Sequence, residues 1–157
     1  MSYEVAELQR KLAGMIQITT ITSVDHAAKK LRVRLGAGES AELPWPAIAG
    51  RNFVVWRPLR VGQQLILLSP NGDPAQGVVI GELYSQTIDP PSTDEAVDLI
   101  LFNNGNKLEH NIGTGEIHIT AKGNVIVNGD VIADGISLIN HVHKDVTAGK
   151  AKTGKPA

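Results

Sequence analysis

The stretch Ile16-Gln17-Ile18-Thr19-Thr20-Ile21 alternates apolar and polar residues, and Leu31-Arg32-Val33-Arg34-Leu35 repeats the alternation after a polar turn. Successive side chains of a β-strand point to opposite faces, so this pattern predicts two half-buried strands. Further strands are predicted at 41–45, 61–68 and 76–81, with a loop at 47–60 and a turn at Pro70-Asn71-Gly72-Asp73. Five short strands in about 70 residues predict a small closed barrel, of which the OB-fold is the most common five-stranded form.

The composition of the 157-residue chain excludes several classes of protein. Lys and Arg number 15 and Asp and Glu 16, so no net charge draws the chain to nucleic acid or anionic lipid. The chain has no cysteine, which excludes disulfides and thiolate metal sites. We find no apolar run long enough for a membrane span and no pattern of a secretion signal at the N-terminus.

Residues 1–14 are predicted to form a short amphipathic helix. Val5, Leu8 and Leu12 recur at helical spacing among charged residues, and Gly14 is a stop signal. A cap over one end of the barrel is the favoured role, and docking to another protein is the alternative. Residues 85–96, with Pro90 and Pro91, read as a linker too short to hold an inserted catalytic domain.

After Phe102 the aromatic residues vanish, and short Val- and Ile-rich strands are predicted at 99–102, 108–112, 117–121, 125–128, 131–133 and 136–139. Gly123, Gly129 and Gly135 are spaced by six residues. One interpretation is the hexapeptide coil of a left-handed β-helix, a fold that often hosts acyltransferases. The regular stretch provides roughly one such coil, whereas repeat folds need about three.

The other interpretation is that three chains together supply the missing core. Residues 97–140 bury too little apolar surface alone. Three copies around one axis would enclose a narrow lumen and would pair every edge strand. The residues expected inside that lumen are Ile117, Ile119, Val125, Val127 and Val131. We therefore expect a homotrimer.

His141 and His143 form a His-x-His pair near the end of the chain. In a strand, residues two apart share a face, so the two imidazoles are expected side by side. A solvated polar tail, or two surface histidines beside Asp145, would explain the pair without a ligand. One chain would give a metal only two ligands, but three chains would give six nitrogens, which iron and nickel accept and zinc rarely uses. We expect His26, His110 and His118 to be structural or exposed.

The motifs, taken in order, resemble the baseplate assembly protein V family, the central spike proteins of contractile phage tails. The resemblance covers nearly the whole chain. It is carried by Ile18-Thr19-Thr20-Ile21, Val24-Asp25-His26-Ala27-Ala28, Leu31-Arg32-Val33-Arg34, Leu43-Pro44-Trp45-Pro46, Val54-Val55-Trp56-Arg57-Pro58, 61–68, 69–81, His141-Val142-His143 and Thr153-Gly154-Lys155-Pro156.

The resemblance implies a mainly β chain: an N-terminal OB-fold barrel, followed by an intertwined trimeric triple-stranded β-helix with a metal-bound apex. The expected segments are the N-terminal helix 1–14, the OB-fold 15–84, the linker 85–96, the spike 97–140, and the apex with the C-terminal tail 141–157. The implied metal is one iron ion per trimer, held by His141 and His143 of each chain, ahead of zinc or nickel.

The implied function is structural, with no catalysis and no small-molecule substrate. The spike caps the tail tube, contacts baseplate hub and tube proteins, and pierces the host outer membrane when the sheath contracts. The expected location is the baseplate tip of a virion, or a tailocin particle, assembled in the cytoplasm of the bacterial host.

Two rival functions are weaker. A nucleic-acid-binding OB module needs a basic groove and stacking aromatics, whereas residues 15–85 hold seven Lys or Arg against five Asp or Glu, and Trp45 and Trp56 adjoin prolines in loop-like segments. An enzyme would need a nucleophile elbow, a zinc-protease motif or a phosphate loop, and the sequence contains none of these.

Overall fold

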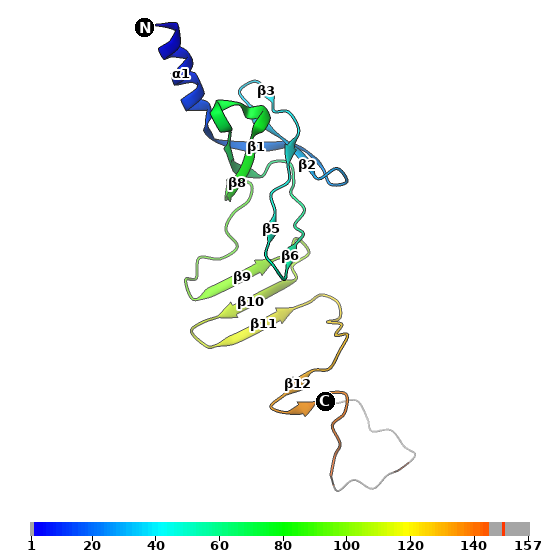
Figure 1. Ribbon diagram of the computed structural model, residues 1–157. Helices are drawn as coiled ribbons and strands as arrows, with labels where there is room; N and C mark the ends of the chain where they lie inside the picture. The colour runs from blue at the N-terminus through cyan, green and yellow to red at the C-terminus, as the bar shows by residue number, and fades with distance from the viewer. Residues whose placement is uncertain (1, 145–148, 150–157) are drawn as a thin grey trace. The chain divides into compact units, whose positions relative to one another are not determined.

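The computed structural model describes residues 2–144 and 149. The chain forms two compact units, one that ends at Thr93 and one that begins at Asp94. Figure 1 shows the elements of both units in chain order. No helix in the described part of the chain is long and apolar enough to cross a membrane.

The first unit is built on an antiparallel sheet whose hydrogen-bonded order is β3-β2-β1-β7-β8, with β4 paired to β2. Its strands are β1 (Ile16–Asp25), β2 (Lys30–Leu35), β3 (Gly38–Glu39), β4 (Leu43–Pro44), β7 (Gln64–Leu68) and β8 (Val78–Leu83). β1 pairs with β7 through its first half and with β2 through its second half, and the register shifts between Ile21 and Ser23. This bulge bends β1, so a single strand serves two neighbours.

The predicted closed barrel is not what the structure shows. Among the described residues, the sheet ends at β3 and β8, and no ladder joins its two edges. The strand predicted at 41–45 shrinks to the two residues of β4. Pro44 has no N–H to donate and Pro46 follows it, so this segment cannot extend a ladder. The unit is therefore of OB type with an open sheet.

The alternation in the sequence correctly predicted the buried side of β2, where Leu31 and Val33 lie in the core. In the first half of β1 the predicted side is wrong, because Ile16 and Ile18 are 63% and 64% exposed and Thr19 is buried. The inward-facing residues of β1, β2, β4 and β7 meet Leu59 in one core, and its members are Ile21, Leu31, Val33, Leu43, Leu59, Leu65 and Leu67. Thr19 is buried beside them and donates a hydrogen bond from its hydroxyl to the Arg34 carbonyl at 2.5 Å. Burial of each such aliphatic side chain stabilises the fold by about 1.5–3 kcal/mol.

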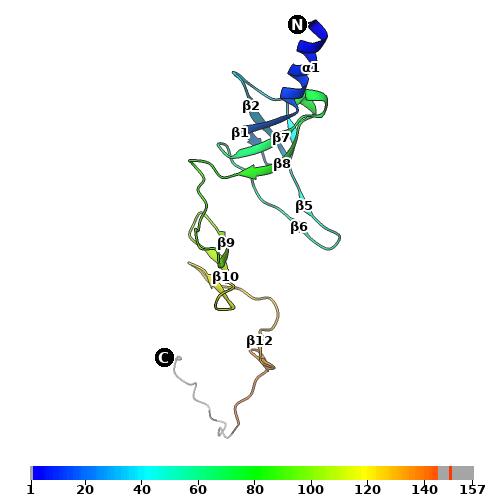
Figure 2. The same cartoon turned by 90° about the vertical axis from the view of Figure 1, so that its left-hand side faces the viewer.

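The region predicted as a loop at 47–60 contains a short hairpin, β5 (Ile48–Ala49) and β6 (Val54–Val55), which stands out from the sheet (Figure 2). Phe53, Val54 and Trp56 on this hairpin are exposed. The predicted turn at 70–73 becomes two short 3₁₀ helices, η1 (Pro70–Gly72) and η2 (Pro74–Gln76).

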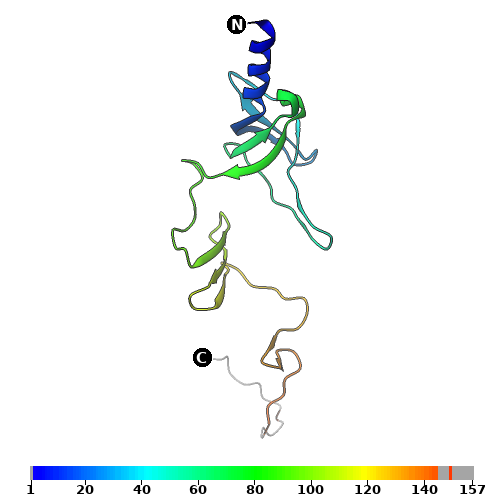
Figure 3. The same ribbon diagram turned by 60° about the vertical axis from the view of Figure 1, so that its left-hand side comes forward.

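The predicted N-terminal helix is present as α1 (Tyr3–Gly14), and the hydroxyl of Ser2 accepts a hydrogen bond from the Val5 N–H at its start. The expected cap over the barrel end is wrong. None of the residues of α1 is buried, and Leu8 and Leu12 are each 67% exposed. Figure 3 shows that α1 meets the sheet of its unit at the C-terminal end of the helix and projects beyond it.

The second unit contains a three-stranded antiparallel sheet, β11-β10-β9, formed by β9 (Val97–Leu101), β10 (Lys107–Asn111) and β11 (Glu116–Thr120). A hairpin follows, β12 (Ile132–Ala133) with β13 (Ile136–Ser137). The predicted strand at 125–128 is not formed within the chain. Because all these pairings are antiparallel, they do not fit the parallel coils of a hexapeptide β-helix.

None of the described residues of the second unit is buried. The register places Ile100 opposite Leu108 and Leu108 opposite Ile119, and Ile117 lies two residues from Ile119 on the same face. We call these four residues the apolar face of the β9–β11 sheet, and all four are exposed in the single chain. Asp98 and His110 lie on the same side of the sheet. A sheet of this size with a bare apolar face is marginal in water.

Candidate functional site

The segment that presents the histidine pair begins with the β12–β13 hairpin. Its two turn residues, Asp134 and Gly135, both have positive φ, at 50° and 81°. This is the requirement of a two-residue type I′ turn, for which Asp-Gly is a preferred sequence. The hairpin therefore forms from local sequence and fixes where the chain goes next.

Asp130 ties the residues after the hairpin to those before it. Its carboxylate accepts hydrogen bonds from the Ser137 hydroxyl and from the Ile139 N–H, the latter at 3.1 Å. The Ser137 hydroxyl also accepts the Asn140 N–H at 2.8 Å. The hydrogen bond from Ser137, helped by backbone N–H groups, lowers the pKa of Asp130, because these donors stabilise its charged form.

The same Ser137 positions His141. The Ser137 carbonyl accepts the His141 backbone N–H at 3.1 Å. Nδ1 of His141 lies 3.0 Å from the Ser137 carbonyl oxygen and 3.1 Å from that of Leu138. A carbonyl oxygen only accepts, so these contacts favour a proton on Nδ1 and leave the Nε2 lone pair free for a ligand. Metal-binding histidines are held in this way in many proteins.

His141 and His143 lie together, with ring centroids 5.1 Å apart and ring planes at 80°. Residues 140–144 are not in a strand, so the contact comes from the turn after β13 and not from the predicted strand alternation. The imidazole chemistry suits iron, nickel or zinc. Within residues 2–144 and 149, however, no group of three or more His, Cys, Asp or Glu side chains could hold a metal ion. The residues present fit a metal only as part of a shared site.

Asp145 and Thr153-Gly154-Lys155-Pro156 lie outside the described residues, as does most of the predicted tail.

The other three histidines lie apart from this pair. His26 packs its ring against Trp45 and directs Nε2 to the Leu59 carbonyl at 3.1 Å, so it is structural. His118 contacts the Glu116 carboxylate at 3.0 Å, and this hydrogen bond lowers the pKa of Glu116. Nδ1 of His110 lies 3.9 Å from the Oδ2 carboxylate oxygen of Asp98. Each of the last two is a surface pair of one histidine and one acid.

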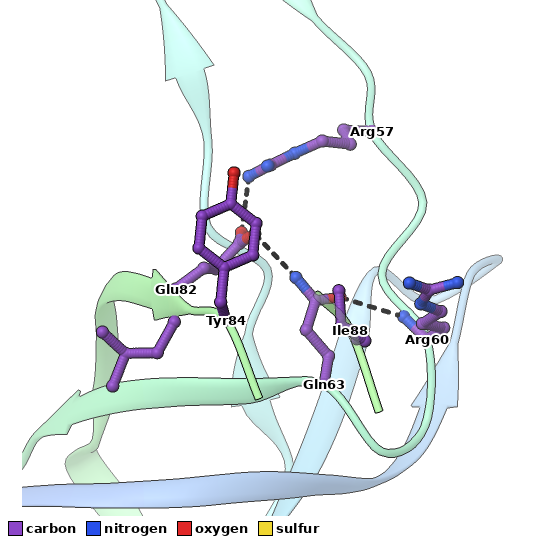
Figure 4. A pocket seen from close by; sticks show the side chains of 7 residues that line it. Arg57, Arg60, Gln63, Glu82, Tyr84 and Ile88 are labelled. Carbon is purple, nitrogen blue, oxygen red and sulfur yellow. Dashed lines mark hydrogen bonds and ion pairs between the residues drawn. The ribbon is translucent and has the colours of Figure 1, made fainter. Parts of the chain in front are cut away.

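The first unit contains a pocket lined by Glu82 and Leu83 of β8, by residues of the segment before β7 and by residues after β8 (Figure 4). Glu82 is the centre of its polar contacts. Arg57 forms an ion pair with Glu82 at 2.5 Å, and the Gln63 side-chain amide donates to the second oxygen of Glu82 at 2.6 Å. Tyr84 and Ile88 close the pocket. This arrangement ties the end of β8 to the preceding loop and offers no nucleophile with an adjacent base.

The two tryptophans also have a structural explanation. Trp45 and Trp56 stack with ring centroids 5.3 Å apart and planes at 21°, so each covers one face of the other. Trp45 contacts His26 as well. This stack ties the end of β6 to the segment after β4, and Trp56 remains 54% exposed.

Sequence reasoning assigned no role to Asp130 or Ser137, which hold His141 in place. The usable signal was the Asp134-Gly135 pair between two short apolar runs, which indicates a hairpin. A hairpin at this point brings residue 137 back beside 130.

Residues 17–84 match the family described as the Type VI secretion system/phage-baseplate injector OB domain. The matched range begins inside β1 and ends one residue after β8, so it coincides with the sheet of the first unit. A search of curated proteins gave no match.

Proposed function

We propose that this chain, which belongs through its OB domain to the baseplate assembly protein V family, is the central spike of a contractile phage tail or of a related injector. The family is a structural component of the baseplate, and this supports a structural role for the chain. Its partners would be baseplate hub and tail tube proteins, in a virion or a tailocin particle.

The observation that carries the proposal is the bare second unit. Its strands expose Ile100, Leu108, Ile117 and Ile119 on one face, and none of the described residues buries them. Three copies wound around one axis would bury these faces against one another and pair the free edges of β9 and β11. Each aliphatic side chain so buried would contribute on the order of 2 kcal/mol.

A spike must keep its tip from fraying, and chain ends are ordinarily the least ordered part of a domain. The Asp130–Ser137 network holds His141 with one ring nitrogen free, and His143 lies against it. Three chains that meet at this point would present six imidazoles. We propose iron as the shared metal, with nickel or zinc as the alternatives. A bound metal supplies a cross-link between the three chain ends.

Such a trimer is suited to a mechanical role. Interchain strands and a metal-linked tip resist unfolding along the axis, which a rigid point needs if sheath contraction is to drive it through the outer membrane of a Gram-negative cell. The proposal requires no catalytic residue and no small-molecule substrate.

Metal analysis of the purified trimer tests the apex. We expect about one iron per three chains by inductively coupled plasma mass spectrometry. The double variant His141→Ala, His143→Ala should lose the metal while keeping the trimer mass, because the apolar faces remain. The matched control His118→Ala removes an exposed histidine on the other side of the β9–β11 sheet and should keep the metal. Full metal content in the first variant would overturn the assignment.

A further inference from the structure

Three exposed apolar residues of α1 and the residue that follows the helix have the spacing of a heptad repeat. Val5, Leu8, Leu12 and Met15 are spaced by three, four and three residues, the spacing of successive a and d positions in a coiled coil. Met15 continues the helical backbone, with φ −68° and ψ −37°. All four side chains are exposed in the single chain, and Leu8 and Leu12 are 67% exposed. We call these four residues the α1 seam.

The charged residues of α1 lie where they do not oppose this packing. Glu7 receives two hydrogen bonds from the Arg10 guanidinium, at 2.7 and 2.9 Å, so these charges pair within one helix. By the heptad spacing, Glu7 and Arg10 fall at c and f, on the side away from the seam. In parallel copies, Glu4 at g faces Gln9 at e, so no like charges meet.

α1 is held firmly at one end. A Cβ added to Gly72 would lie 2.4 Å from the Lys11 carbonyl oxygen, and one added to Gly14 would lie 3.3 Å from the Gly72 carbonyl oxygen. The Ser69 N–H donates to the Met15 carbonyl at 2.7 Å. Two glycines thus let the backbone of η1 touch the last turn of α1. These contacts fix the C-terminal end of the helix on the OB domain (Figure 3).

We infer that the α1 helices of three copies pack in parallel along the α1 seam as a short coiled coil that joins their OB domains. The inference rests on the proposed trimer, which supplies three seams at once. A single helix of 12 residues gains little stability alone in water. A repeated a/d spacing is the pattern that copies of one helix need to pack into one another, whereas capping a sheet end requires no such repeat.

Site-directed cross-linking tests this contact in the full chain, which has no native cysteine. Leu8→Cys places a thiol in the seam, and Ala6→Cys places one on the opposite side of the same helix. With a short bis-maleimide, Leu8→Cys should give covalent dimers from most of the protein, and Ala6→Cys should stay monomeric on a denaturing gel. The mass of both variants before cross-linking is measured by light scattering.

The outcomes separate the two proposals. A trimer by light scattering in which Leu8→Cys cross-links no better than Ala6→Cys overturns the coiled coil and leaves the spike proposal standing. A monomer by light scattering with no cross-link in either variant overturns both. Selective cross-linking of Leu8→Cys in a trimer supports the inference. If Leu8→Cys lowers the trimer fraction, Val5→Cys offers the same readout one turn earlier.

Discussion

The two units of this chain use the same kind of strand in opposite ways. In the OB domain, Leu65 on β7 is 0% exposed and belongs to a core of seven apolar residues. In the second unit, Ile119 on β11 is 62% exposed, and none of the described residues there is buried. Both residues lie on alternating strands of antiparallel sheets.

The difference indicates that the strands of the second unit form within one chain, whereas burial of their apolar side chains requires other copies. Its hydrogen-bonded ladders form within one chain, but within the part of the chain that the structure describes its apolar face stays exposed. Exposed apolar area on this scale ordinarily marks an interaction surface. The OB domain is expected to be stable by itself, and the second unit by contact with other copies.

The largest expected effect comes from a charge on the apolar face. In a single chain, Ile119→Asp would change stability by less than about 0.5 kcal/mol, as surface substitutions do. In a trimer it would bury three unpaired carboxylates together, which costs several kcal/mol for each charge. We expect the variant to fall from trimer to monomer in sedimentation velocity at neutral pH.

Thr120→Asp is the matched control, because Thr120 is the next residue on β11 and points to the opposite face. It should leave the trimer intact. An Ile119→Asp variant that sediments like the wild-type protein would show that this face is not an interface.

A smaller effect is expected inside the OB domain. Gly72→Ala adds a Cβ 2.4 Å from the Lys11 carbonyl oxygen at a position where φ is +71°. Gly62→Ala has similar backbone strain, with φ +88°, and meets nothing within 4 Å. Backbone strain of this kind lowers the free energy of unfolding by about 1–3 kcal/mol in both variants. At Gly72 alone, the clash lowers it by roughly 1–3 kcal/mol more.

Urea unfolding followed by tryptophan fluorescence measures both glycine variants, since Trp45 and Trp56 are the only tryptophans and both lie in the OB domain. Gly72→Ala should unfold at clearly lower urea than Gly62→Ala. Equal midpoints would mean that the contact between α1 and η1 is not rigid.

The smallest expected effect concerns the segment before the histidine pair. The Ser137 hydrogen bond lowers the pKa of Asp130 from its ordinary value of 3.8. The pKa of Asp130 in the folded state is therefore below its pKa in the unfolded state. The stabilising contribution of Asp130 to folding is fully present at pH values above the unfolded-state pKa, and it is lost as the pH falls through the folded-state pKa.

The Ile139 amide donates to this carboxylate, and its proton chemical shift should report the titration in NMR spectra. Its midpoint should lie below pH 3.8 in the wild-type protein. In Asp130→Asn the titration should disappear. A midpoint at or above the ordinary value would contradict the hydrogen-bonded network.

The sequence was a good guide where local periodicity decides structure. Leu31–Leu35 was recognised as a strand because one face of it is buried, and burial imposes the alternation. Ile16–Ile21 was also recognised as a strand, but its alternation indicated the wrong face, since Ile16 and Ile18 are exposed and Thr19 is buried. The β5–β6 hairpin was missed because two-residue strands carry no measurable period. The barrel was predicted closed because strand count alone does not reveal that Pro44 and Pro46 block a ladder.

At the candidate site, too, the sequence predicted one feature and missed others. The adjacency of His141 and His143 follows from their spacing, although a turn and not a strand produces the contact. The supporting contacts of Asp130 and Ser137 depend on a hairpin that joins residues seven apart, and composition does not predict them. Exposure of the α1 seam was also unpredictable, because an amphipathic pattern does not state which surface it will meet.

The central claim is that the second unit obtains its core from other copies of the chain. Sedimentation equilibrium of the intact wild-type chain tests this claim most directly. The chain has a mass of 16.7 kDa, and we predict a single species of three times that mass over a wide range of micromolar concentrations. A stable, folded species of 16.7 kDa over the same range would contradict the account.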